Sequence, residues 1–194
     1  MEVIRMCCRY GASAKMYEQL GKYPGMPKVL KTGDIHPSEA APVLQMSPKE
    51  HGICFREMRW GFPVDGRLLI NARAESALTK PTFAENMALR RCIIPASFFY
   101  EWDADKNKFT FDLPHDQILF MAGCYRPEKD GSHFVILTTA ANASMEKVHD
   151  RMPLIFPEAK MEAYLTDDHA LPSLLASAPP LLNSWQEYEQ LSLF

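Results

Sequence analysis

The chain has 194 residues, of which 47% are hydrophobic and 23% are charged, and this composition suits one globular domain with a sizeable core. The net charge of -3 excludes a protein that is basic over its whole surface, so binding to nucleic acid would need a local cluster of arginine and lysine. The five cysteines have neither C-x-x-C nor zinc-finger spacing, which argues against a disulfide scaffold and against structural zinc.

Short apolar runs separated by glycine and proline predict many strands and few helices. The first expected element is a helix over residues 13–20, capped by Ser13. Another helix is expected over 82–89, because Thr82 and Glu85 have the spacing of a capping box. Two more helices are expected at 141–148 and 157–165. Strands are expected at 43–46, 52–62, 90–95, 98–102, 108–113, 118–125 and 133–139.

This order of elements predicts an α+β fold dominated by antiparallel sheet, in one domain that spans residues 1–194. Residues 183–194 are expected to form a polar carboxy-terminal tail. The first residues, MEVIR, lack the apolar run of a signal peptide, and no window is apolar enough to span a membrane. We therefore expect a cytoplasmic protein.

Cys7 is the first candidate for chemistry, because it lies near the amino terminus. A cysteine with a free α-amine can condense with an aldehyde to an imine and then close a thiazolidine ring through its thiol. The amine titrates near pH ~8 and the thiol near ~8.5, so both supply some reactive form at neutral pH. The adjoining Arg9 would lower the thiol pKa and attract phosphate. The alternative is an inert buried cysteine.

Two further residue types suit proton transfer. Glu101 lies between Tyr100 and Trp102 in an expected strand, where desolvation could raise its pKa and make it a general acid or base. The alternative for Glu101 is an acid that faces solvent. His149 can transfer protons near neutral pH, and its alternative is a structural hydrogen bond.

Several arginines adjoin apolar or small-residue tracts, and Trp60 directly follows one of them. Arginine for phosphates and aromatic rings for unstacked bases are typical of proteins that bind single-stranded nucleic acid. The alternative is a set of solvated charges at strand edges. The arginines concerned are Arg9, Arg59, Arg73, Arg90, Arg91 and Arg151.

Six motifs resemble, in the same order, those of the SOS response-associated peptidase (SRAP) family of abasic-site processing proteins. The family pattern opens with Met-Cys-Gly-Arg-Tyr/Phe and ends with His-x-Arg-Met-Pro. Any one motif is weak, but six in sequence are highly specific, and they cover about residues 6–165. The matching stretches are Met6 to Tyr10, Trp60-Gly61, Asn71 to Glu75, Arg91 to Trp102, Thr138 to Asn142 and His149 to Pro153.

The resemblance implies a barrel-like core of antiparallel sheet with short flanking helices. It implies a sensor of abasic sites in single-stranded DNA that forms a thiazolidine DNA–protein cross-link. By this resemblance Cys7 is the nucleophile, and Glu101 assists ring opening, imine formation and removal of the residues ahead of Cys7. His149 would handle protons at the sugar, and Asn71 would hold the Cys7 amine and the sugar.

The resemblance also implies how DNA is bound. Arg9, Arg73 and Arg151 would bind phosphates, and Trp60 would stack a base or wedge the duplex. Neither a metal nor an organic cofactor is implied. The expected partners are single-stranded DNA with abasic sites and replication-fork proteins, the expected state is a monomer, and DNA-bound molecules would lie in the nucleoid.

Three departures from the family pattern bear on function. Met1 to Arg5 precede the motif, and while they remain the Cys7 nitrogen is an amide that cannot form a thiazolidine. We therefore expect either a start at Met6 or removal of the leader by the protein itself. Cys8 replaces a glycine, and Asp34 replaces an asparagine of the early loop.

Two other functions stay open from the sequence. One is a non-covalent module for single-stranded DNA that has lost cross-linking. The other is a conventional cysteine peptidase that uses Cys7, His149 and Glu101.

Overall fold

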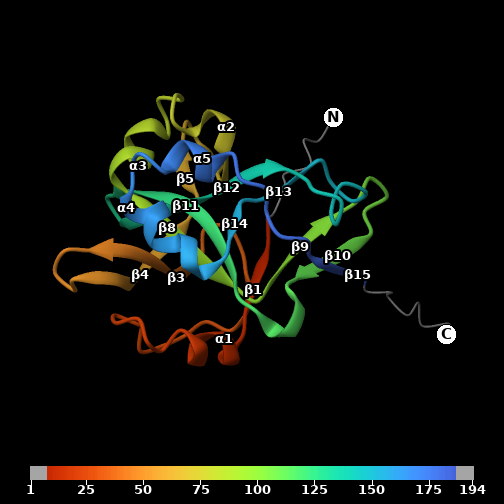
Figure 1. The fold of residues 1–194 in the computed structure, drawn as a ribbon, viewed down its shortest axis with the longest axis horizontal. Coiled ribbons are helices and arrows are strands. Elements are labelled where there is room, and N and C mark those ends of the chain that lie inside the picture. The colour runs from red at the N-terminus through yellow and green to blue at the C-terminus, as the bar shows by residue number, and fades with distance from the viewer. Residues whose placement is uncertain (1–7, 187–194) are drawn as a thin grey trace.

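The computed structural model describes residues 8–186, and Figure 1 shows how their strands and helices are arranged. The described residues form fifteen strands and five short α-helices. The helices are α1 (Ala14–Gln19), α2 (Ala74–Ala77), α3 (Ala84–Leu89), α4 (Met161–Thr166) and α5 (Leu171–Leu175). No helix within residues 8–186 is long and apolar enough to cross a membrane.

Five strands close into a barrel: β3 (Ala40–Ser47), β4 (Gly52–Trp60), β8 (Arg91–Ala96), β11 (Leu119–Glu128) and β12 (Gly131–Ala140). The ring runs β12-β4-β3-β8-β11 and closes where β11 and β12 pair as a hairpin. All its pairs are antiparallel except β12 with β4, which is parallel. The prediction of a mainly antiparallel, barrel-like α+β fold with short helices is confirmed.

Short strands border the barrel. β7 (Asn71–Arg73) and β13 (Arg151–Pro153) both pair with β12, and β14 (Ile155–Phe156) pairs with β11. The hairpin of β5 (Phe62–Val64) and β6 (Arg67–Leu69) is a separate two-stranded sheet.

A second sheet of five antiparallel strands has the order β15-β10-β9-β1-β2. Its strands are β1 (Tyr10–Ala12), β2 (Gly33–Ile35), β9 (Phe98–Trp102), β10 (Lys108–Asp112) and β15 (Asn183–Gln186). β9 follows the barrel strand β8 after one residue, so the two sheets are covalently continuous at that point. Part of the expected tail is therefore the edge strand β15, and its remainder lies outside the described residues.

The indole of Trp60 joins the barrel to the second sheet from inside the core. Its ring is fully buried, and its N–H donates to the Ile70 carbonyl oxygen at 3.0 Å. The ring lies 5.1 Å from the Tyr10 ring of β1 and stacks at 6.2 Å on Phe134 of β12. The expectation that Trp60 stacks a DNA base is therefore wrong, because no part of the ring is available to a ligand.

Three expected helices differ in detail from the structure. α3 begins at Ala84 without a side-chain cap, so the capping box expected from Thr82 does not form. Residues 141–148 form hydrogen-bonded turns in place of a helix. The expected helix at 157–165 is a 3₁₀ turn, Glu158–Lys160, followed by α4. In contrast, α1 has the predicted Ser13 cap, whose hydroxyl accepts from the Met16 N–H.

Gly123 in β11 tests how tightly the barrel is packed. A Cβ at this position would lie 2.4 Å from Ile94 Cδ1 and 2.5 Å from the Val135 carbonyl oxygen. We expect Gly123→Ala to lower the free energy of unfolding by about 1–3 kcal/mol, because overpacking forces the two neighbouring strands to shift. Urea denaturation measures the loss.

The matched control for this prediction is Gly52→Ala, at the start of β4. A Cβ there meets no atom within 4 Å, so we expect a change within about 0.5 kcal/mol. Equal stability of the two variants would contradict the packing of β11 between β8 and β12.

Candidate active site

The pairing of β1 with β9 sets the position of the acid. Tyr10 lies opposite Phe99, and the Tyr100 N–H donates to the Arg9 carbonyl oxygen at 3.0 Å, so the same register continues past the end of β1. This register places Cys8 opposite Glu101. Residues that lie directly opposite in an antiparallel pair share one face of the sheet. The residue after the expected nucleophile therefore faces the expected acid.

The electrostatics of Cys8 agree with this placement. Burial raises the pKa of the Cys8 thiol, the negative charge of Glu101 raises it further, and Arg9 opposes both effects. Cys8 is therefore held as a neutral thiol at neutral pH. Cys7 lies outside the described residues.

Glu101 is completely buried, so the alternative that it faces solvent is wrong. Side chains alternate along a strand, and Glu101 shares its face with the buried Phe99. Tyr100 and Trp102 are on the opposite face. The flanking rings thus do not explain why this carboxyl group is kept from water; the burial of the inner face does.

The outer face of β9 carries two neighbouring aromatic rings with a cation beside both. The Arg9 guanidinium carbon lies 5.8 Å from the Tyr100 ring centre and 5.5 Å from that of Trp102. Arg9 also contacts Asp34 of β2, with 3.5 Å between Nη1 and Oδ2. Trp102 is partly exposed, unlike Trp60, so it is the aromatic residue that a ligand at this face would meet. The sequence could have identified Trp102 as a candidate ligand contact, because it directly follows Glu101 at the end of an expected strand.

A second polar cluster lies where β7, β12 and β13 run side by side. Arg151 binds Glu75 through two hydrogen bonds of 2.5 and 2.8 Å and also donates to the Thr138 carbonyl oxygen at 2.6 Å. The hydrogen bond from Arg151 lowers the pKa of Glu75. Arg73 pairs with Thr138 in the β7–β12 register, and its side chain is exposed. Within residues 8–186, Arg73 takes part in none of the ion pairs, so its charge faces solvent.

His149 belongs to this second cluster. Its Nδ1 lies 3.0 Å from the Arg151 backbone nitrogen and 2.9 Å from Asp150 Oδ1. These two contacts correspond to two protonation states. Neutral His149 accepts from the Arg151 N–H and carries its proton on Nε2, whereas protonated His149 can donate from Nδ1 to Asp150. A proton carrier at this position therefore has a partner in each state.

Asn71 lies between the two clusters. It is the first residue of β7 and follows Ile70, whose carbonyl oxygen accepts from the Trp60 indole. The Trp60 ring in turn contacts Tyr10 of β1, two residues from Cys8. A continuous path of contacts thus leads from Cys8 and Arg9 through Trp60 to Asn71, and along β7 and β12 to Arg151 and His149.

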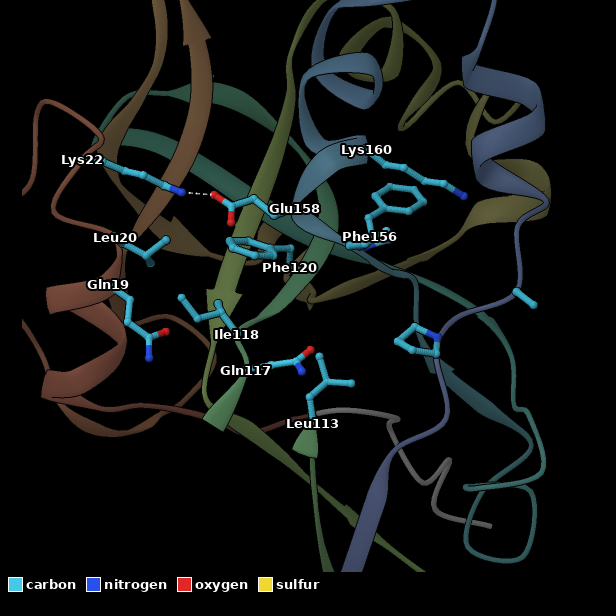
Figure 2. A pocket seen from close by; sticks show the side chains of 13 residues that line it. Gln19, Leu20, Lys22, Leu113, Gln117, Ile118, Phe120, Phe156, Glu158 and Lys160 are labelled. Carbon is cyan, nitrogen blue, oxygen red and sulfur yellow. Dashed lines mark ion pairs between the residues drawn. The ribbon is translucent and has the colours of Figure 1, made fainter. Parts of the chain in front are cut away.

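A well-formed cavity of about 540 Å³ lies elsewhere, between α1, β11 and the residues after β14. Figure 2 shows its apolar floor, with Leu20, Ile118 and Phe120, and the ion pair of Lys22 with Glu158 at its rim. None of the expected site residues lines it. Among residues 8–186 no group of three or more His, Cys, Asp or Glu side chains is placed to hold a metal ion.

Comparison with known proteins gives a consistent result. The family model described as SOS response associated peptidase (SRAP) matches residues 6–191. Abasic site processing protein YoqW of Bacillus subtilis is 30% identical over 192 residues, which cover 89% of this chain and 85% of that protein. Abasic site processing protein YedK of Escherichia coli is 32% identical over 131 residues, covering 62% of this chain and 59% of that protein.

Solved structures share the fold. A protein from Bordetella bronchiseptica superimposes with a TM-score of 0.77 at 21% identity, over 94% of this chain and 100% of that one. A protein from Bacteroides thetaiotaomicron superimposes with a TM-score of 0.76 at 22% identity, over 93% and 91% of the two chains.

The placement of Cys8 opposite Glu101 predicts how this thiol reacts. In a Cys7→Ser background, alkylation of Cys8 by iodoacetamide at pH 8 should be slower than that of a free cysteine, because its pKa is raised. Glu101→Gln removes a charge that raises this pKa, so we expect alkylation to become faster by roughly the factor of a few that one nearby charge produces. Mass spectrometry of the peptide that contains Cys8 measures the rate.

Glu146→Gln, which changes an exposed acid, is the control and should leave the rate unchanged. The buried Cys54, Cys92 and Cys124 should not react in the folded protein. Identical rates with and without the Glu101 charge would show that Cys8 and Glu101 are not neighbours.

Proposed function

Because the chain belongs to the SOS response associated peptidase family, we propose that it processes abasic sites in single-stranded DNA by forming a covalent thiazolidine cross-link through Cys7. The observation that carries this proposal is the register of β1 on β9, which places the residue after Cys7 opposite a fully buried acid. Because Cys7 directly precedes Cys8 in the chain, this register supports Glu101 as the proton-transfer group for Cys7.

The chemistry needs only groups that the chain supplies. The Cys7 amine adds to the aldehyde carbon of the ring-opened abasic sugar, and loss of water gives an imine. The Cys7 thiol then adds its sulfur to the imine carbon and its proton to the nitrogen, which closes the five-membered ring. The amine must be free, so the six residues from Met1 to Met6 must first be absent or removed.

Glu101 serves this sequence as an acid and base, because each addition and the loss of water move a proton. Asn71 holds the Cys7 amine and the sugar, and His149 exchanges protons with the sugar from the second cluster. The paired contacts of His149 with Arg151 and Asp150 support this role, since both protonation states have a partner. Glu101 also assists removal of the leader.

The arginines bind the DNA backbone in this proposal. Arg73 is exposed and Arg9 and Arg151 are partly exposed, at the two clusters that flank Asn71. Trp102 takes the base-stacking role first expected of Trp60, because its ring is partly exposed and lies beside Arg9. Phosphate contacts position the strand, and the aromatic ring meets the unstacked base.

A second candidate function, non-covalent binding of single-stranded DNA, is supported by the residues that precede Cys7. If the residues ahead of Cys7 are retained, the Cys7 amine is blocked, and the side chain of Cys8 adds bulk next to it. The protein would then bind single-stranded DNA without forming a covalent bond. The two functions differ in whether a covalent adduct forms.

The adduct assay decides between them. Protein that begins at Cys7 should form an adduct with a single-stranded oligonucleotide containing one abasic site, and the adduct should survive a denaturing gel. Cys7→Ser should lose the adduct and keep non-covalent binding, because the arginines are unchanged. Glu101→Gln should form the adduct more slowly, by about 10²–10⁴-fold if it transfers protons in the slow step.

The chain with Met1 retained is the control, and it should form no thiazolidine until its leader is removed. Binding without any adduct by protein that begins at Cys7 would favour the non-covalent module. Turnover of unrelated peptides would favour a conventional peptidase.

The exposed Arg73 predicts a salt effect. Arg73→Ala should weaken binding of single-stranded DNA and lower the slope of log K against log salt by about 0.7, because one phosphate contact is lost. Fluorescence anisotropy at several salt concentrations measures this slope. Lys49→Ala, in the exposed β3–β4 turn, is the control; an unchanged slope for Arg73→Ala would remove Arg73 from the DNA site.

A further inference from the structure

The carboxylate of Asp34 is held by two donors on the outer face of the second sheet. Arg9 Nη1 lies 3.5 Å from its Oδ2, and the Tyr100 hydroxyl donates to its Oδ1 at 3.1 Å. The β1–β2 register places Asp34 opposite Gly11, so no side chain of β1 stands between the acid and these donors. One carboxylate thus binds a guanidinium and a phenol that come from different strands.

The Arg9 guanidinium is poorly satisfied by this arrangement. An arginine has five N–H donors. Among the described residues its hydrogen bonding is limited to the long contact with Asp34, and its Nε is buried without a hydrogen-bond partner. The ring centres of Tyr100 and Trp102 lie 5.8 and 5.5 Å from the guanidinium carbon, and the Lys108 ammonium lies 3.9 Å from the Tyr100 ring centre. The result is a positioned cation with unused donors and a second cation close by.

A phosphodiester has the features that this arrangement would bind. Its two non-bridging oxygens and single negative charge match the two oxygens and single charge of the Asp34 carboxylate. Arginine and hydroxyl donors are common partners of backbone phosphates. The Asp34 and Arg9 side chains are each 33% exposed, so water screens their ion pair and the pair contributes little to stability. Exchange of the carboxylate for a phosphate therefore meets little resistance from the fold.

We propose that Arg9 and the Tyr100 hydroxyl form a phosphate site for single-stranded DNA, which Asp34 occupies in the free protein as an internal competitor. This inference rests on the proposed function, because it assumes that the ligand is DNA. Asp34 neutralises one arginine at the site and stays near the bound phosphate, so it weakens binding to any strand, damaged or not. A covalent adduct does not depend on this equilibrium once it has formed. Asp34 therefore favours release of undamaged DNA over release of the cross-linked lesion.

Asp34→Asn tests the site, because the amide keeps an acceptor oxygen for Tyr100 and Arg9 and removes only the charge. With an undamaged oligothymidine, fluorescence anisotropy should show binding about fivefold tighter at 0.1 M salt and a slope of log K against log salt that is steeper by about 0.7, the effect of one additional phosphate contact. Adding Arg9→Ala to Asp34→Asn should abolish both gains, and adding Tyr100→Phe should reduce them.

Glu50→Gln is a matched control. Glu50 pairs with Arg56 at 3.6 Å, and the two side chains are 38% and 39% exposed, so this variant removes one acid from a similar ion pair in the distant β3–β4 hairpin. It should leave both affinity and slope unchanged. An equal gain from Glu50→Gln, no gain from Asp34→Asn, or a gain that survives Arg9→Ala would each overturn the proposal.

The adduct assay separates this inference from the proposed function. If Asp34→Asn binds undamaged DNA no more tightly while protein that begins at Cys7 still forms adducts, the phosphate site is wrong and the cross-linking function stands. If Asp34→Asn shows the gain while no variant forms an adduct, the phosphate site stands and the cross-linking function is wrong.

Discussion

The buried indole of Trp60 is the contact on which the candidate site depends. It packs against Tyr10 of the second sheet and Phe134 of the barrel, and its N–H binds the carbonyl oxygen of Ile70. Replacing a buried tryptophan with alanine typically costs about 3–5 kcal/mol, so this ring is a substantial part of the joint between the two sheets. Because Tyr10 lies two residues from Cys8 and Ile70 precedes Asn71, the same ring positions both sides of the site. The Trp60 ring therefore serves in packing, whereas Trp102 is partly exposed and would meet a ligand at the outer face of β9.

Two of the three arginines that we propose to bind DNA form ion pairs with acidic side chains. Arg151 is bound by Glu75 and Arg9 by Asp34, whereas Arg73 is exposed outside the ion pairs of residues 8–186. A carboxylate beside an arginine fixes the orientation of the guanidinium but cancels its long-range attraction for phosphate. This agrees with the net charge of -3. In the proposed function, this pairing would weaken the non-covalent binding of undamaged strands, and the covalent cross-link would hold the protein at a lesion.

The burial of Glu101 has two physical consequences. A carboxyl group on the inner face of β9 is away from bulk water, where proton transfer to a nearby reactant does not compete with transfer to solvent. At Cys8 the family has glycine, and here the residue places a thiol near this group. Burial raises the pKa of the Cys8 thiol, and the charge of Glu101 raises it further. A neutral thiol is a poor nucleophile, so Cys8 would be a weak competitor of Cys7 in the proposed cross-linking reaction.

The sequence by itself determined the fold class, the family and the longer strands, which are β3, β4, β8, β9, β10, β11 and β12. Alternating apolar residues predicted β10, and the helix cap at Ser13 was predicted correctly, because these signals are local. The local signals were insufficient for Thr82, whose capping box does not form, and for residues 141–148, which turn without a helix. The motifs that resemble those of the family gave Glu101, Asn71 and His149 as candidate site residues, and their catalytic roles stay predictions.

Only the tertiary structure decided which side chains face each other and which are exposed. Trp60 and Trp102 both lie beside functional motifs, yet one is in the core and the other is partly exposed, because β4 ends inside the joint between the sheets while β9 ends at its edge. The pairing of Asp34 with Arg9 depends on the register of β1 and β2, which joins residues 25 positions apart. Burial and register arise from contacts between segments distant in the sequence, and local sequence patterns do not reveal them.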